Sequence, residues 1–99
     1  MVVVGGTVLI KAECVSDAHK LCLWMTEETL KEVGCITYGF HQSLNDPNTI
    51  QVFEEWDSIE DLTNHLATSH FAEFIEKLTP LAAGEPNVKI YEIESVRPL

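Results

Sequence analysis

The stretch CITYGFHQSLNDPNTIQVFEEW, residues 35–56, decides the fold. Residues 35–42 and 50–56 each alternate apolar and polar side chains with the period of a β-strand. Between them, Asn45-Asp46-Pro47-Asn48 combines residue types that favour turns. The stretch therefore predicts an antiparallel hairpin with a long loop. The apolar face of its first strand would consist of Ile36, Tyr38 and Phe40.

Apolar residues at helical spacing flank this hairpin on both sides. Before it, a helix capped by Ser16 or Asp17 should run to about Val33 and end at Gly34. Its buried stripe would be Ala18, Leu21, Cys22, Met25, Thr29 and Val33, and its solvent side Glu27, Glu28, Lys31 and Glu32. After the hairpin, Asp57 or Ser58 should open a second helix. Thr68-Ser69 interrupts it, and Ser69 can cap a continuation through Leu78.

Strand-like alternation at residues 2–13 and 88–93 completes the order β-α-β-β-α-β. That order predicts a ferredoxin-like α+β fold with an antiparallel sheet, forming one domain over residues 1–99. Both helices would cover the same face of the sheet. The uncovered apolar face is costly in water, so we expect two chains to pair as a homodimer.

The charge balance limits the partners of the protein. Six Lys and Arg against sixteen Asp and Glu give a net charge of −10, which disfavours nucleic acid and anionic membrane surfaces. Cys14, Cys22 and Cys35 are odd in number and show no C-x-x-C spacing, so we expect free thiols. The start of the chain lacks a basic region followed by an apolar run, and we expect a cytoplasmic protein.

An ordered series of short motifs runs through the chain. It consists of Gly34-Cys35-Ile36-Thr37-Tyr38, His41-Gln42, Asp46-Pro47-Asn48, Glu54-Glu55-Trp56, His65 to Phe71, Pro80 to Gly84 and Tyr91-Glu92. In this order and spacing the chain resembles the antibiotic biosynthesis monooxygenase (ABM) family, over about residues 8–94. Ser69 departs from the family pattern, where many relatives have Pro, but Ser also caps helices.

The resemblance implies a ferredoxin-like domain whose sheets pair into a dimeric α/β barrel. It also implies oxygenation without flavin, haem or metal, so we expect no cofactor. Haem-degrading relatives carry Trp at the place of His65 and His at the place of Ile75, and this sequence has neither. The leading function is a cofactor-independent monooxygenase acting on a small aromatic quinol, phenol or anthrone with dioxygen. An isomerase or tautomerase using the same pocket, or a non-enzymatic ligand-binding dimer, remains open.

Such chemistry needs a base, a donor for the developing oxyanion and a dry pocket. We predict His65 as the base, because it follows core Leu62 by three residues and titrates near neutral pH. Glu54 lies on an apolar strand face, where an unpaired carboxylate is expensive, and it is expected to hold His65. Tyr38, on the neighbouring strand, would donate its hydroxyl. A structural His, an edge ion pair and a core tyrosine are the respective alternatives.

Four further residues are predicted to bind the substrate. Trp56 and Phe71 would form aromatic walls for a flat ring, although both residue types are common in cores. His70 and His41 are candidate contacts; His70 can instead bridge the helix break, and His41 can be solvated. No metal site is expected, since His65 and His70 at i,i+5 fall on different helix faces.

Overall fold

The computed structural model describes all residues from 1 to 99 and has one four-stranded sheet. The elements are β1 (Val2–Leu9), α1 (Val15–Thr29), β2 (Cys35–Gln42), β3 (Thr49–Trp56), α2 (Ile59–Leu66), α3 (Ser69–Leu78) and β4 (Asn87–Glu92), with 3₁₀ turns at Ala12–Cys14 and Thr79–Leu81. This confirms the ferredoxin-like βαββαβ order, with the second helix in two pieces. No helix is long and apolar enough to cross a bilayer.

The sheet has the strand order β2-β3-β1-β4, and every neighbouring pair is antiparallel. The register aligns Tyr38 with Glu54, Glu54 with Val4, and Val4 with Ile90. These four residues form one row across the sheet. Successive side chains on a strand point to opposite faces, so the row lies on a single face.

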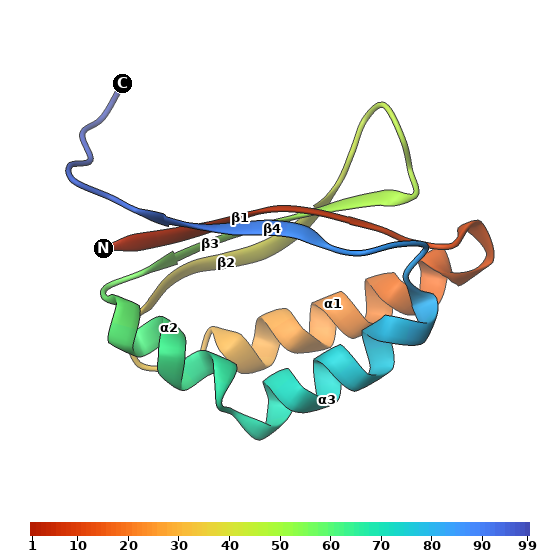
Figure 1. Cartoon of the computed structure of the whole chain (residues 1–99), viewed down its shortest axis with the longest axis horizontal. Coiled ribbons are helices and arrows are strands. Elements are labelled where there is room, and N and C mark those ends of the chain that lie inside the picture. The colour runs from red at the N-terminus through yellow and green to blue at the C-terminus, as the bar shows by residue number, and fades with distance from the viewer.

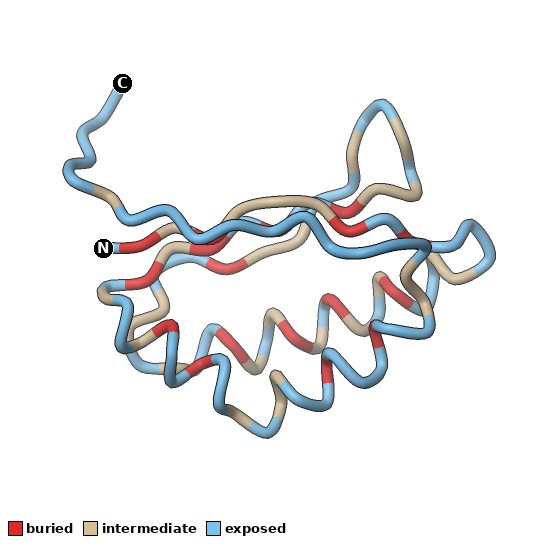
Figure 2. Tube along the Cα trace, in the orientation of Figure 1, coloured by how far each residue is buried: buried red, intermediate tan, exposed pale blue.

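The three helices lie along that face of the sheet (Figure 1). Buried residues line both sides of the junction between helices and sheet, as the red segments in Figure 2 show. The core comprises Val2, Val4, Val8, Ile10, Ala18, Cys22, Met25, Tyr38, Ile50, Trp56, Leu62, Phe74 and Leu78. Burial of this cluster is the main force that holds the helices on the sheet.

The opposite face of the sheet carries no helix (Figure 1). Leu9, Phe53 and Tyr91 alternate with residues of the helix-covered face and are exposed. The expected uncovered face is therefore present in the isolated chain, but it mixes these apolar side chains with polar ones, among them Gln51, Glu55 and Lys89.

The end of α1 differs from the expectation in a way that matters for the site. The helix stops at Thr29 rather than near Val33, and residues 30–34 form a turn that leaves Val33 exposed. Gly34 has a φ of 83°, and a Cβ there would lie 2.2 Å from the Asp61 carboxylate. The turn therefore packs tightly against α2, and Glu32 leaves the solvent side predicted for it.

Three smaller predictions were also wrong. The first strand ends at Leu9 rather than Glu13, because the backbone of Lys11 turns away to bond with Leu81. A β-bulge between Cys35 and Thr37 removes Ile36 from the face of Tyr38 and exposes it. Helix α3 is capped by Thr68, whose hydroxyl accepts from the Phe71 amide at 3.2 Å, and not by Ser69. Ser58 caps α2 as expected.

Candidate functional site

A cavity of about 280 Å³ lies between the sheet and helices α2 and α3. Its walls are Val4, Val8, Tyr38, Phe40, Val52, Glu54, Leu62, Leu66, Phe71, Phe74, Ile75, Leu78, Pro86, Val88 and Ile90. Glu54 is the only ionisable carboxyl group among them, and Tyr38 carries the only hydroxyl. The cavity is therefore an apolar chamber with two neighbouring polar groups on its floor.

Glu54 is held in this chamber by its position on β3. Trp56, two residues along the same strand, shares its face and donates from Nε1 to Oε1 of Glu54 at 2.9 Å. Burial raises the pKa of Glu54 from 4.5 to about 7; the Trp56 hydrogen bond opposes this change and the charge of Glu32 adds to it. A carboxylate with that pKa exchanges a proton readily at neutral pH.

Tyr38 lies directly opposite Glu54 on the neighbouring strand and is buried. Burial, followed by the charge of Glu54, raises the pKa of Tyr38 above its ordinary value of 10. The phenol therefore stays protonated at neutral pH and can donate a hydrogen bond. Phe40 packs edge-on against the Tyr38 ring, with centroids 5.4 Å apart, which fixes the ring.

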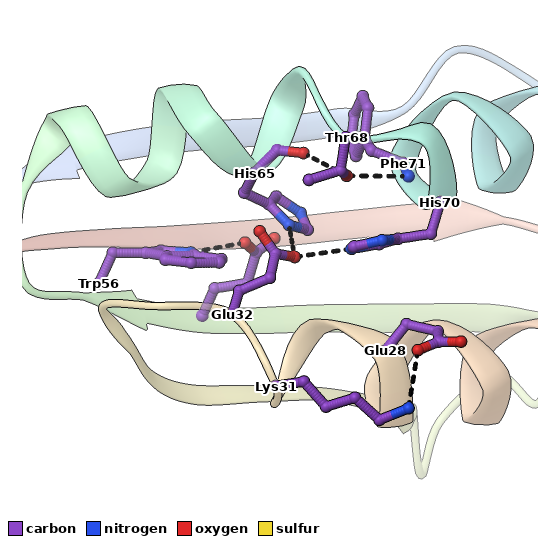
Figure 3. A network of polar contacts seen from close by, with 9 residues as sticks. Glu28, Lys31, Glu32, Trp56, His65, Thr68, His70 and Phe71 are labelled. Carbon is purple, nitrogen blue, oxygen red and sulfur yellow. Dashed lines mark hydrogen bonds and ion pairs between the residues drawn. The ribbon is translucent and has the colours of Figure 1, made fainter.

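His65 is fully buried at the end of α2, but its carboxylate partner is Glu32 and not Glu54. Nδ1 of His65 donates to Oε2 of Glu32 at 2.6 Å, while Nε2 of His70 donates to the same oxygen at 2.7 Å. Figure 3 shows both imidazoles converging on Glu32, and Trp56 directed towards a different carboxylate. The predicted Glu54–His65 pair is therefore wrong. Burial lowers the pKa of His65, although Glu32 opposes that change.

The break between α2 and α3 aligns the two histidines. The hydroxyl of Thr68 donates to the His65 carbonyl at 2.7 Å and accepts from the Phe71 amide. It therefore binds the C-terminal end of α2 and caps the N-terminal end of α3. This change of direction brings His70 round to Glu32, which a continuous helix would not do.

The other predicted site residues divide between three places. Phe71 lines the cavity, as expected. Trp56 does not; it is completely buried and packs on the His65 ring, with centroids 4.8 Å apart. His41 lines a separate hollow of about 230 Å³ between α1 and β2, beside His19. His65 and His70 are also absent from the cavity walls, although His65 contacts Tyr38 and Phe71, which belong to them.

Sequence reasoning missed Glu32 as a functional candidate. The predicted helix ran to about Val33, and on a helix of that length the Glu32 side chain points to solvent. Gly34, a residue type that accepts positive φ, was the available signal that the helical phase ends before this segment. Glu32, His65 and His70 together offer three metal-type ligand atoms within 4.8 Å of one another.

Comparison with known proteins identifies relatives of the whole chain. The sequence model of a family described as antibiotic biosynthesis monooxygenase matches residues 1–77. An uncharacterised protein from Synechocystis sp. is 32% identical over 98 residues, covering 99% of this chain and 67% of that protein. A conserved protein from Methanosarcina mazei Go1 is 36% identical, with a TM-score of 0.88 over 91% of this chain and 89% of that chain. A Deinococcus radiodurans protein, named as a candidate antibiotic biosynthesis monooxygenase, is 25% identical with a TM-score of 0.94, over 100% of this chain and 98% of that chain.

Proposed function

Because the chain belongs to the antibiotic biosynthesis monooxygenase family, we propose that it oxidises a small aromatic quinol, phenol or anthrone with dioxygen, without a cofactor. The observation that carries this proposal is Glu54, a carboxyl group with a pKa of about 7 on the floor of an apolar cavity. A base of that strength removes a phenolic proton at neutral pH, and the apolar walls suit a flat aromatic ring.

The substrate itself supplies the electrons. Glu54 takes the phenolic proton, and the electron-rich phenolate ring reduces dioxygen and forms a C–O bond at a ring carbon that bears hydrogen. This carbon is para to the oxygen in a phenol or anthrone with a free para position, and ortho to it in a quinol. The proton returned by Glu54 completes a hydroperoxide at that carbon. Loss of the ring C–H proton then breaks the O–O bond and forms a second C=O, with water as the other product. One phenol and one O₂ thus give one quinone and one H₂O.

We assign the catalytic roles differently from the sequence prediction. We assign the base to Glu54 rather than His65, because Glu54 lines the cavity and His65 does not. We assign to Tyr38, which lines the cavity, the donation of its hydroxyl to the substrate oxygen, and to Phe71 and Phe40 the role of aromatic walls. His65 supports this floor from behind through its contact with Tyr38.

Two further parts of the proposal concern the assembly and the compartment. The exposed apolar side chains of Leu9, Phe53 and Tyr91 support a homodimer that pairs the uncovered sheet faces. Three free cysteines, two of them only partly buried, support a reducing compartment such as the cytoplasm.

The test is turnover of a panel of quinols, phenols and anthrones, followed by oxygen uptake and by ¹⁸O incorporation from ¹⁸O₂. We expect uptake of one O₂ per quinone formed. Glu54→Gln should lower kcat by about 10²–10⁴-fold, the usual contribution of a general base. Glu60→Gln, which changes an exposed carboxylate on α2, should leave kcat unchanged.

Other outcomes would replace the proposal. Substrate conversion without oxygen uptake would indicate an isomerase or tautomerase. Ligand binding without any conversion would indicate a binding protein. Full activity in Glu54→Gln, together with loss of activity per folded molecule in His65→Ala, would return the role of the base to His65.

A further inference from the structure

Glu32, His65 and His70 form a cluster whose carboxylate and imidazole nitrogens take no part in the proposed oxidation. The three residues come from the turn after α1, the end of α2 and the first turn of α3. Their side chains meet at one point, where two imidazole nitrogens lie 2.6 and 2.7 Å from a single carboxylate oxygen (Figure 3). None of the three lines the cavity.

No lysine or arginine side chain neutralises Glu32. Its sequence neighbour Lys31 turns away and pairs with Glu28 at 3.0 Å. Both hydrogen bonds of Glu32 go to imidazole nitrogens, and the three ligand atoms lie within 4.8 Å of one another. A neutral imidazole or a carboxylate can bind a transition metal without first giving up a strongly held proton.

We propose that Glu32, His65 and His70 bind a divalent transition-metal ion of the Zn²⁺ type. Two imidazoles and one carboxylate form a frequent ligand set for zinc, whereas Mg²⁺ and Ca²⁺ prefer oxygen donors throughout. The surrounding net charge of −10 attracts cations to the protein as a whole. The fourth position would be taken by water.

The burial of the three ligands fits this role. The His65 side chain is 1% exposed and is clamped between Trp56 and Phe71, so its direction is fixed before an ion arrives. The side chains of His70 and Glu32 are 21% and 14% exposed, which leaves a path for the ion and for water. Metal–nitrogen and metal–oxygen bonds are about 2.0–2.2 Å long. To make room for the ion, the Glu32 carboxylate has to move slightly away from the two imidazoles, and the His70 ring has to move towards that of His65. The two partly exposed side chains are those that have to move.

A bound ion would join three segments that are otherwise linked by hydrogen bonds and packing. Metal binding to the folded state alone raises its stability by mass action. The site lies outside the cavity, so this inference and the proposed oxidation can each fail without the other.

The experiment uses tag-free protein, freed of metal with a chelator and titrated with ZnCl₂ in a calorimeter. We expect one ion per chain and a higher thermal midpoint in the presence of zinc. Glu32→Gln and His70→Gln should each weaken binding by at least about tenfold, since even residues behind the ligands usually contribute that much. Glu28→Gln and His19→Gln, which change the same residue types elsewhere, should bind like the wild type.

Cobalt provides a second readout that does not depend on stability. Co²⁺ in a four-coordinate nitrogen and oxygen site should give intense visible bands in the wild type and in Cys35→Ser, but not in Glu32→Gln. Absence of stoichiometric binding would overturn the proposal. So would binding that survives both Glu32→Gln and His70→Gln, or that is lost in Cys35→Ser, because the ion would then occupy a different site.

Discussion

Replacement of Glu54 by Gln should stabilise the protein at pH 8 and do so much less at pH 5.5. The pKa of this carboxyl rises from 4.5 to about 7 on folding, mainly through burial. The folded state therefore binds the proton more tightly than the unfolded state, and stability is lost as the pH rises from 4.5 to 7. Gln carries no charge and keeps an oxygen that can accept from Trp56 Nε1.

The size of the effect follows from the two pKa values. Linkage gives a destabilisation by the Glu54 carboxylate of about 1 kcal/mol at pH 5.5 and about 3 kcal/mol at pH 8. The stability difference between Glu54→Gln and the wild type should therefore grow by about 2 kcal/mol between these pH values. All other titrating groups are shared by the two proteins, so their contributions cancel in the difference.

The assay is urea unfolding at both pH values, followed by far-UV circular dichroism at a fixed protein concentration. Glu60→Gln, which removes an exposed carboxylate on α2, serves as the control. Its unfolding free energy should differ from that of the wild type by the same small amount at both pH values. A difference for Glu54→Gln that is independent of pH, or that grows towards low pH, would refute the reasoning. The carboxyl of Glu54 would then be ionised at its ordinary pKa and unsuited to work as a base at neutral pH.

Two further predictions concern the turn after α1 and the uncovered face of the sheet. Gly34→Ala should lower stability by at least about 1–2 kcal/mol, because Gly34 has a positive φ and a Cβ would meet the Asp61 carboxylate. Gly84→Ala, where a Cβ meets nothing within 4 Å, should be nearly neutral in the same urea titration. Phe53→Glu should convert the expected dimer to a monomer of 11.1 kDa in sedimentation equilibrium, while Leu44→Glu in the β2–β3 loop should not; an unchanged mass for Phe53→Glu would remove the sheet face as the dimer contact.

The features set by short-range periodicity were predictable from the sequence. Strand alternation placed Tyr38 and Glu54 on the helix-covered face, and the cap at Ser58 started α2 where it was expected. The residues that line the cavity are set by contacts between helices and strands, and the alternation of apolar and polar residues along each strand predicts only part of these contacts. Trp56 was expected in the cavity wall because it shares a face with Glu54, but α2 covers it with His65 instead.

The features that failed depend on contacts between distant segments. No local pattern announces the β-bulge that exposes Ile36, because the extra residue is accommodated by pairing with β3. Likewise, the turn that redirects Glu32 is fixed by the packing of Gly34 against Asp61, 27 positions along the chain from the glycine. Helical phase predicts a direction only as far as the helix extends, and α1 ends three residues before Glu32.

The position of Glu32 also decides whether Glu54 is available as the proposed base. If Glu54 were needed to hold His65, its carboxylate would be committed to an ion pair and its pKa would fall. Because Glu32 supplies both imidazoles with their acceptor, Glu54 retains a single hydrogen bond, from Trp56, and stays in an apolar chamber. The burial that makes the Glu54 carboxylate destabilising also raises its pKa to about 7. The turn at residues 30–34 thus determines, from outside the cavity, that Glu54 is the carboxylate available for the proposed role of base.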